Sequence, residues 1–263
     1  MFTESNQNGI ITMSSDLLGT KNVFTTRFGG VSGGDYASLN LGSDRGDDPD
    51  CVRENHARLC SLFGVGPDDA CVTKQVHGNV VREVTEKDKH VCLSVTPYVA
   101  DGLVTACRRL PLICLIADCV PVLLADGKGR AVAAVHCGWR SSVADILGNA
   151  VAAMEALGAE AKDIRAALGP ALGQCCFESD ADVVEAIEAY IGPNDCCIRR
   201  GAKYFIDLRG ANRIRLLQLG LLPENIDVSD ECTFCLHEKY WSHRYTLKNN
   251  LNRGSQVAGI MLE

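Results

Sequence analysis

The stretch "AVAAVHCGWRSSVADIL" at residues 131–147 changes character halfway along, and this change decides the fold class. Residues 131–135 are small or β-branched apolar residues, which is typical of a strand covered on both faces. From Val143 onwards, apolar residues recur at helical spacing, and Gly158 suits a helix C-cap. A buried strand followed by a helix predicts mixed α and β structure. His136 ends the strand, at the rim where α/β proteins commonly build their sites.

The rest of the chain continues this mixture without strict alternation of strands and helices. A helix is expected at 48–64, with Asp48 as N-cap and Pro49 in the first turn, and Gly64 closes it. Residues 70–84 read as two strands around a tight turn at Gly78 and Asn79. Further strands are expected at 22–28, 101–106, 112–118, 120–126, 164–169, 225–229 and 256–262, and further helices at 179–190 and 208–220.

These patterns predict an α+β (α/β) fold of mixed sheets flanked by helices, rather than a doubly wound Rossmann sheet. No repeat, low-complexity linker or change in composition divides the chain. We therefore expect a single layered domain over 1–263, with a poorly defined N-terminal segment at 1–20.

Length and charge narrow the class of protein. The 263 residues, 46% of them hydrophobic, are enough to bury a large core. A net charge of −7 argues against a nucleic-acid groove or an anionic membrane surface, because both need clustered lysine and arginine. The first residues lack a signal-peptide pattern, and the most apolar stretch, 110–125, is too short to span a bilayer. We expect a cytoplasmic protein with no nucleic-acid or membrane partner.

The fourteen cysteines show no disulfide framework of a small secreted scaffold. The adjacent pairs 175–176 and 196–197 have poor geometry for bridging each other, and the pattern indicates a reducing compartment. Cys232 and Cys235 form a C-x-x-C motif that can hold metal or change redox state. In a chain so rich in cysteine, however, we expect two buried thiols.

Several catalytic motifs fail on their context. The G-x-S-x-G pattern around Ser32 runs into more loop, whereas a nucleophile elbow needs a helix directly after the serine. The segment from His237 begins like the zincin motif H-E-x-x-H, but residue 241 is tryptophan. The zinc-deaminase signature, the Walker loop and the dinucleotide-binding glycine motif are absent.

Three residues at strand ends or turns remain as a candidate metal site: His77, Cys119 and His136. Two imidazoles and one thiolate suit zinc and leave one position open, which distinguishes a catalytic zinc from a structural one. The ligands are 42 and 17 residues apart (119 − 77 and 136 − 119), so their spacing is weak evidence. The residue types alone equally allow His136 to be a core histidine with one satisfied hydrogen bond.

Eight segments resemble the YfiH/laccase-domain family, formerly called the polyphenol oxidase family. The resemblance runs in the family's order from Phe24 to Leu262 and so covers nearly the whole chain. The segments are "FTTRFGGVSGGDYASLNLG", "GDDPDCVRENHARL", "KQVHGNVV", "ADGLVT", "ADCVPVLLAD", "AVAAVHCGWRSSV", "LGPALGQCCFE" and the C-terminal "WSHRYT…GSQVAGIML".

This resemblance implies that His77, Cys119 and His136 are zinc ligands. It also implies purine nucleoside chemistry: phosphorolysis of adenosine, inosine, guanosine or methylthioadenosine, and deamination of adenosine. The partners would be these nucleosides and phosphate, for a monomer or homodimer. Copper is an alternative occupant, since it outbinds zinc at most nitrogen and sulfur sites.

The chain departs from the family at four positions. His56 stands where the family commonly has arginine, Cys137 where it has alanine, and Ser141 where it has glycine. Gln256 stands where an arginine is usual. If either missing arginine touches phosphate in the family, phosphorolysis here is expected to be weak.

Phosphorolysis needs cations to hold phosphate and polar groups to hold the nucleoside. Guanidinium groups suit phosphate, although each arginine also fits a structural ion pair and each polar residue a loop contact. The candidates are Arg27, Arg140 and Arg244 for phosphate, Asn40 and Gln75 for ribose or base, and Glu178 for proton transfer.

Three other classes compete with this interpretation. A multicopper polyphenol oxidase relies on H-x-H pairs, and the six histidines form none. A cysteine hydrolase acting on peptidoglycan precursors would use Cys119 as nucleophile and His136 as base, but it leaves His77 without a role. A zinc-stabilised interaction module is disfavoured because a chain of this size should not need a metal to fold.

Overall fold

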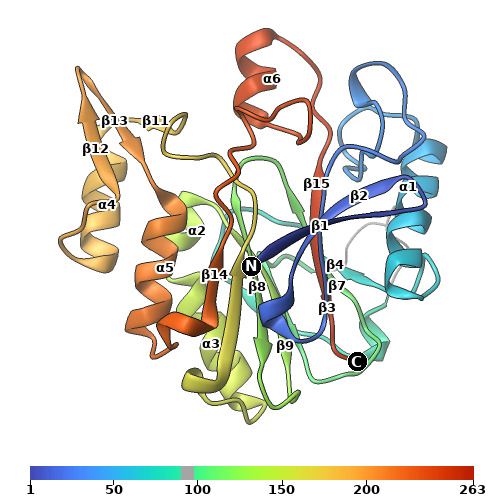
Figure 1. Cartoon of the computed structure of the whole chain (residues 1–263), viewed down its shortest axis with the longest axis horizontal. Helices are drawn as coiled ribbons and strands as arrows, with labels where there is room; N and C mark the ends of the chain where they lie inside the picture. The colour runs from blue at the N-terminus through green and yellow to red at the C-terminus, as the bar shows by residue number, and fades with distance from the viewer. Residues whose placement is uncertain (90–97) are drawn as a thin grey trace.

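The computed structural model describes residues 1–89 and 98–263, and it contains two six-stranded sheets (Figure 1). Neighbouring strands of the first sheet are antiparallel except for the parallel pair β7 and β4. In spatial order this sheet consists of β1 (Phe2–Gln7), β2 (Ile10–Ser15), β3 (Lys21–Thr25), β15 (Gln256–Met261), β7 (Leu112–Ile116) and β4 (Cys71–Val72).

The second sheet carries the strands of the opening stretch. Its inner strands are antiparallel, and each edge strand is parallel to its neighbour. Its order is β14 (Ile226–Val228), β10 (Ile164–Leu168), β8 (Val120–Asp126), β9 (Val132–Cys137), β6 (Gly102–Thr105) and β5 (Val81–Glu83). A third, small sheet has the order β11 (Glu178–Ser179), β13 (Lys203–Ile206) and β12 (Cys197–Arg200).

Helices cover the outer faces of the two large sheets (Figure 1). The α-helices are α1 (Pro49–Phe63), α2 (Trp139–Val143), α3 (Ile146–Ala156), α4 (Ala181–Ile191), α5 (Leu208–Gln218) and α6 (His243–Asn249). Short 3-10 turns occur at Asp16–Leu18, Gly34–Tyr36, Glu86–Asp88, Ala161–Asp163 and Pro223–Asn225. Within the described ranges, no helix is both long enough and apolar enough to cross a membrane.

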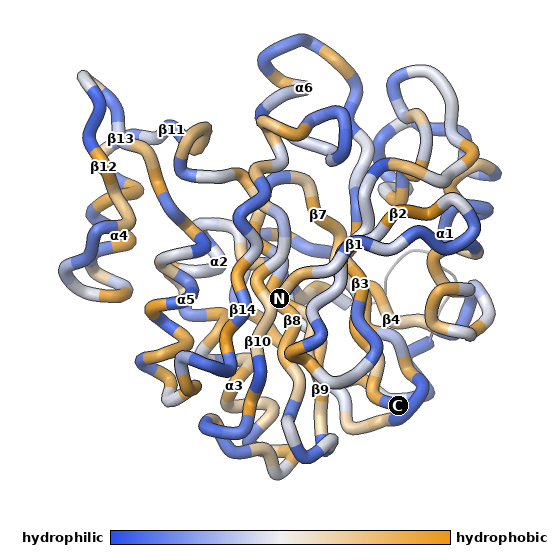
Figure 2. The backbone as a smooth tube through the Cα atoms, in the orientation of Figure 1, coloured by the Kyte–Doolittle hydropathy of each residue, from blue (hydrophilic) through white to orange (hydrophobic). Residues whose placement is uncertain are grey.

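Three apolar clusters fill the spaces between these layers. Leu103 and Leu123 of the second sheet pack between the sheets with residues of the first, such as Ile260. Val135 of β9 packs on the other face with helical residues such as Leu147. A third cluster joins α1 to the first sheet. Figure 2 shows the hydrophobic residues concentrated along the central strands. The mixed-sheet fold with flanking helices is therefore confirmed, in the layer order helix, sheet, sheet, helices.

The helix expected at 48–64 is confirmed with its caps. The Asp48 side chain accepts a hydrogen bond from Asp50 N, and Pro49 occupies the first turn. Gly64 has the left-handed φ of 72° that a C-cap requires. Local sequence signals were sufficient here because caps act within a few residues of the helix end.

The single helix expected after His136 is instead two helices. Asp145 adopts a left-handed conformation with φ 62° and separates α2 from α3. Its carboxylate caps α3 at Gly148 N and also pairs with Arg215 of α5. A tertiary partner thus stabilises a break that the apolar spacing did not indicate.

The pair of strands expected around a turn at Gly78 and Asn79 was wrong. β4 belongs to the first sheet and β5 to the second, so residues 73–80 cross between the sheets instead of forming a hairpin. The left-handed residue in this crossing is His77, with φ 60°. The carboxylate of Asp101 fixes the crossing, because it accepts hydrogen bonds from the backbone N–H groups of residues 76–78.

Candidate active site and metal centre

The register of the second sheet brings two of the predicted ligands together. His136 lies opposite Pro121 in the antiparallel pair β8 and β9, and Cys119 immediately precedes β8. On the other side of β9, His136 N donates to the carbonyl of Asp101, which immediately precedes β6. The carboxyl end of β9 is therefore flanked by Cys119 on one side and Asp101 on the other.

His77 completes the group from the crossing between the sheets. The candidate ligand atoms of His77, Cys119 and His136 all lie within 4.8 Å of one another. Cys119 Sγ is 3.8 Å from His77 Nε2, and the two imidazole rings meet edge to face with centroids 4.9 Å apart. His136 is buried, whereas His77 is exposed and Cys119 partly exposed. The three residues therefore form a site that is rigid on its inner side and open to solvent on its outer side.

Asp101 holds both histidines of this site. His136 Nδ1 lies 2.8 Å from Asp101 Oδ1, which leaves Nε2 of the ring free to bind a metal ion. The same carboxylate accepts hydrogen bonds from the backbone of the His77 loop at 2.8 to 3.0 Å. Burial opposes ionisation of Asp101, but the hydrogen bonds from His136 and the loop N–H groups outweigh it and lower the carboxyl pKa. Sequence analysis did not single out this residue.

The electrostatics of the site favour an ionised sulfur. Burial alone would raise the pKa of the Cys119 thiol, but His136 and His77 outweigh it and lower that pKa to about 6. Burial alone would lower the pKa of His136, but Cys119 and Asp101 raise it to about 9. A thiolate beside an imidazolium results, and a divalent cation can take the place of the imidazolium proton.

Gly138 has no side chain, and the space beside its Cα atom is taken up by the side chains of His77 and Cys119. A Cβ atom at this position would lie 2.8 Å from His77 Cδ2 and 3.2 Å from Cys119 Sγ. Real Cβ atoms essentially never lie as close to another heavy atom as 2.8 Å. Its φ of −70° is ordinary, so the lack of space, and not the backbone conformation, requires glycine between β9 and α2.

The backbone before Cys119 is also unusual. Asp118 has a φ of 84°, a conformation that costs energy for a residue with a side chain. Three contacts hold it: its carbonyl accepts from Leu172 N, Oδ1 from the Thr233 hydroxyl and Oδ2 from Arg244 N. These contacts come from two loops and from the first turn of α6 (His243–Asn249), all distant in sequence, and they fix the direction in which Cys119 leaves the turn.

Three of the predicted substrate residues make structural contacts. The Arg27 guanidinium donates to the carbonyls of Ala37 and His237. Asn40 is fully buried, and its amide bonds to Gly42, Asp47 and Ser255. Gln75 pairs with the backbone N–H and carbonyl of Leu115. These residues shape the loops around the site.

The other three predicted residues lie at the surface: Arg140 and Glu178 are exposed, and Arg244 is partly exposed. Arg140 is exposed, two residues beyond Gly138, and its guanidinium lies 4.2 Å above the Trp139 ring. Arg244 is partly exposed and donates to the carbonyl of Glu178, whose carboxylate is exposed. The Arg140 guanidinium has no hydrogen bond or ion pair with any described residue, so its charge is available to an anion.

Arg253 is a further candidate that sequence analysis missed. Burial and the nearby Arg45 lower the pKa of its guanidinium, while Asp118 and Cys119 act in the opposite direction. The charge of Arg253 is therefore felt at the site. Its guanidinium has no ion pair within residues 1–89 and 98–263. Only its position near the arginine-bearing C-terminal segment could have indicated it.

The two departures His56 and Gln256 lie inside the fold. His56 is buried on α1, with Nε2 2.8 Å from the carbonyl of Leu41. Gln256 is buried on β15, where its Oε1 accepts from Trp241 N.

Comparison with known proteins agrees with the fold and with the family resemblance. The family model described as multi-copper polyphenol oxidoreductase laccase matches residues 21–263. A protein of Mycobacterium tuberculosis strain H37Rv named purine nucleoside phosphorylase is 38% identical over 224 residues, which is 85% of this chain and 86% of that protein. A protein of an unknown prokaryotic organism named adenosine deaminase is 34% identical and covers 90% of this chain and 92% of its own length.

A solved structure has the same architecture. YlmD of Geobacillus stearothermophilus superposes with a TM-score of 0.92 at 30% identity, covering 100% of this chain and 98% of that one. The match spans both large sheets and the helices around them. The chain belongs to the laccase/YfiH family.

Proposed function

We propose that this protein is a zinc-dependent purine nucleoside enzyme that phosphorolyses adenosine, inosine, guanosine or methylthioadenosine and deaminates adenosine. The observation that carries the proposal is the convergence of His77, Cys119 and His136 on one point with an open outer face. The names of the two relatives support the reactions.

The donor set fits zinc. Two imidazole nitrogens and a thiolate are ligands that zinc prefers, and three protein ligands leave a fourth position for substrate or water. Asp101 supplies the hydrogen bond to the second ring nitrogen that metal-bound histidines normally make. When bound, zinc supplies a Lewis acid that polarises a substrate heteroatom or activates a water molecule.

In phosphorolysis, a phosphate oxygen bonds to the ribose anomeric carbon while the bond from that carbon to the purine breaks. The products are ribose 1-phosphate and the free base. Arg140 and Arg253 are the guanidinium groups available to bind and orient the phosphate, since neither is paired with another described residue. His136 keeps its Nδ1 proton toward Asp101, which orients the ring throughout. In deamination, water replaces the exocyclic amino group, and ammonia and inosine are formed.

The first experiment is chromatography of the products after incubation of zinc-loaded protein with adenosine, with and without phosphate. Adenine and ribose 1-phosphate that form only with phosphate establish the phosphorylase, and inosine in both samples establishes the deaminase. Cys119→Ala should lose the metal ion and all turnover, whereas Cys51→Ser, on α1, should behave as wild type. A Cys119→Ala protein that holds no zinc at the site of His77 and His136 and is still active would overturn the proposal.

A cysteine hydrolase is the second candidate, because Asp101, His136 and Cys119 lie in the order of an acid, base and nucleophile. The low pKa of the Cys119 thiol favours this reading. Full activity on a peptidoglycan precursor in the presence of strong chelator, with loss of activity on thiol alkylation, would support it. Loss of activity with chelator and recovery with zinc would exclude it.

A further inference from the structure

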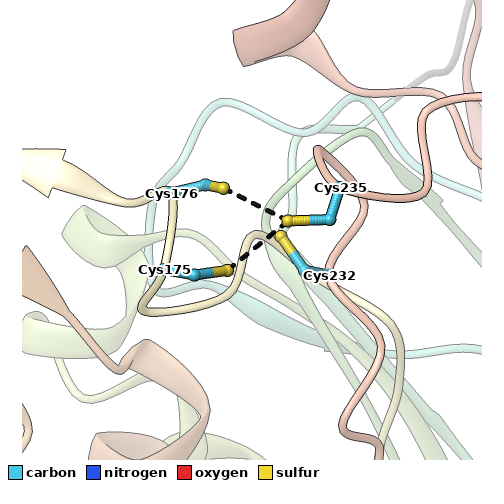
Figure 3. Close-up of side chains that lie close together, drawn as sticks. All are labelled: Cys175, Cys176, Cys232 and Cys235. Atoms are coloured by element: carbon cyan, nitrogen blue, oxygen red, sulfur yellow. Dashed lines mark hydrogen bonds between the residues drawn. The ribbon is translucent and has the colours of Figure 1, made fainter.

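Four cysteines outside the candidate active site converge from two loops that are distant in sequence. Cys175 and Cys176 lie between β10 and β11, and Cys232 and Cys235 lie between β14 and α6. Figure 3 shows the four side chains pointing toward one another. Cys235 Sγ is 3.7 Å from Cys175 Sγ and 3.5 Å from Cys176 Sγ, and the four sulfur atoms all lie within 4.8 Å of one another.

These distances fit a shared ion. Zinc bonds thiolate sulfur at about 2.3 Å, so two sulfurs of a tetrahedral site lie about 3.8 Å apart. The separations of Cys235 Sγ from Cys175 Sγ and Cys176 Sγ are already close to that value, and no pair of the four sulfurs is more than 4.8 Å apart. A disulfide joins sulfurs at about 2.05 Å and would leave Cys235 bonded to one of two nearly equivalent neighbours.

The surroundings of Cys232 favour thiolate. Burial alone would raise the pKa of the Cys232 thiol, but hydrogen bonds to its Sγ from the backbone N–H groups of Cys235, Gly173 and Phe234, that of Gly173 at 3.2 Å, outweigh burial and lower this pKa. Cys232 is buried, whereas Cys175 and Cys235 are exposed, so the inner ligand is fixed and the outer ones are accessible to an ion from solvent.

The cluster also carries a fixed positive charge. Arg209 is buried on α5, donates to the carbonyl of Glu231 and lies within electrostatic range of Cys232 and Cys175. An arginine cannot lose its proton under ordinary conditions, so this charge is permanent. It offsets part of the negative charge that four thiolates bring to one cation.

We propose that Cys175, Cys176, Cys232 and Cys235 bind a second zinc ion in a closed site of four thiolates. Soft thiolate ligands in a tetrahedral arrangement select zinc or an iron centre, and four protein ligands leave no position for a substrate. The site is therefore structural. The expectation that Cys232 and Cys235 are two buried thiols holds for Cys232 but was wrong for Cys235, which is exposed, and the proposal gives both a shared role with a pair about 60 residues away.

The second zinc ties together the loops that hold the active-site turn. Thr233, within the C-T-F-C segment, donates to Asp118 Oδ1 at 2.6 Å, and Leu172 N donates to the Asp118 carbonyl at 2.9 Å. The two loops also pair directly, through a bridge between Ala171 and Cys232. Zinc at the four cysteines thus positions Asp118, and through it Cys119, without touching substrate.

Metal analysis of the intact protein, purified in the presence of reductant and without chelator, tests the proposal. The wild type should contain two zinc ions per chain. The double variant Cys232→Ser/Cys235→Ser should contain one, and Cys119→Ser should contain one. The matched control Cys51→Ser/Cys107→Ser, which removes two cysteines outside both clusters, should contain two.

X-ray absorption at the zinc edge of the Cys119→Ser protein needs no variant of the four-cysteine cluster, so it remains decisive if the double variant does not fold. Four sulfur neighbours and no nitrogen or oxygen neighbour are expected. Nitrogen or oxygen neighbours, iron in place of zinc, or a Cys175–Cys235 disulfide without metal would overturn the proposal. The result is independent of nucleoside turnover, so failure of the proposed function would leave it intact.

Discussion

Asp118 lies between two clusters of candidate metal-binding side chains that differ in the number and kind of their donors. On one side, His77 from the crossing between the sheets, with Cys119 and His136 at strand ends, provides two imidazoles and one thiol, and His77 is exposed. On the other side, four cysteines from two loops bring their sulfur atoms within 4.8 Å of one another. Under the two proposed assignments, three protein donors leave a coordination position free for chemistry, whereas four fill a tetrahedral site that serves stability.

The sharpest test of this difference is a pair of single variants. His136→Ala removes one of three ligands and should lower turnover about 1,000-fold or more, since a metal Lewis acid contributes several kcal/mol to the transition state. Cys235→Ser should lose the other metal ion and lower the melting temperature, yet keep turnover within about tenfold. Steady-state kinetics and thermal unfolding distinguish them. Equal losses of turnover in both variants would contradict the assignment of one site to catalysis and the other to stability.

Asp101→Asn tests whether the open site depends on its hydrogen-bonded support. Both oxygens of the carboxylate accept hydrogen bonds, from His136 and from three backbone N–H groups. The asparagine amide replaces one of these oxygens with an NH₂ group, which would face other hydrogen-bond donors and cannot accept from them. Zinc affinity at the three-ligand site should fall about 10- to 100-fold. Competition with a chromophoric chelator measures this, and the zinc of the four-cysteine cluster should be unaffected.

Arg253→Ala tests whether the open face receives an anion. Loss of one charged hydrogen-bond donor should raise the KM for phosphate about tenfold, corresponding to about 1.4 kcal/mol. Deamination, which uses no phosphate, should be unchanged. Arg253→Lys should recover part of the affinity, and Arg199→Ala, in the small third sheet, serves as the matched control. An unchanged KM would remove Arg253 from the phosphate site.

The smallest effect is expected for the ion pair between Asp126 and Arg130, which lies outside both candidate metal sites. Asp126, the last residue of β8, accepts two hydrogen bonds at 2.8 Å from the Arg130 guanidinium, and this contact lowers its carboxyl pKa from 3.8. Asp126→Asn should lower the free energy of unfolding by about 1 to 2 kcal/mol at neutral pH, with no change in zinc content.

The pH dependence of this loss follows from the direction of the shift. Because the folded-state pKa lies below the unfolded one, the ionised carboxylate stabilises the protein above pH 3.8, and this contribution disappears as the pH falls through the folded pKa. Denaturant unfolding of wild type and Asp126→Asn at several pH values measures it. A difference that grows on acidification would contradict the assignment.

The sequence was informative where structure depends on near neighbours. The caps of α1 and the strands around Leu123 and Val135 were expected with nearly the right bounds, because capping and apolar runs act locally. The break at Asp145 and the crossing at residues 73–80 were not, because each depends on a partner from another element, Arg215 and Asp101 respectively. Local spacing carries no information about such partners.

The same limit applies to the two clusters. His77, Cys119 and His136 were grouped by residue type and by their expected places at strand ends or turns, and the family resemblance then implied their zinc role, since gaps of 42 and 17 residues (119 − 77 and 136 − 119) have no metal-binding pattern of their own. Their roles remain a prediction. Cys232 and Cys235 have the spacing of a metal site, but their partners become visible only when β10 and β14 pair in the sheet.

The space at Gly138 supplies a criterion for sorting related sequences. A Cβ atom at this position would lie 2.8 Å from His77 Cδ2, so a relative with a side chain here could keep all three ligands and still hold the His77 ring away from the other two. A chain with another residue there would be a candidate pseudoenzyme, whatever its motifs suggest. Annotation of such chains should therefore examine the one residue that contributes no side chain to the site.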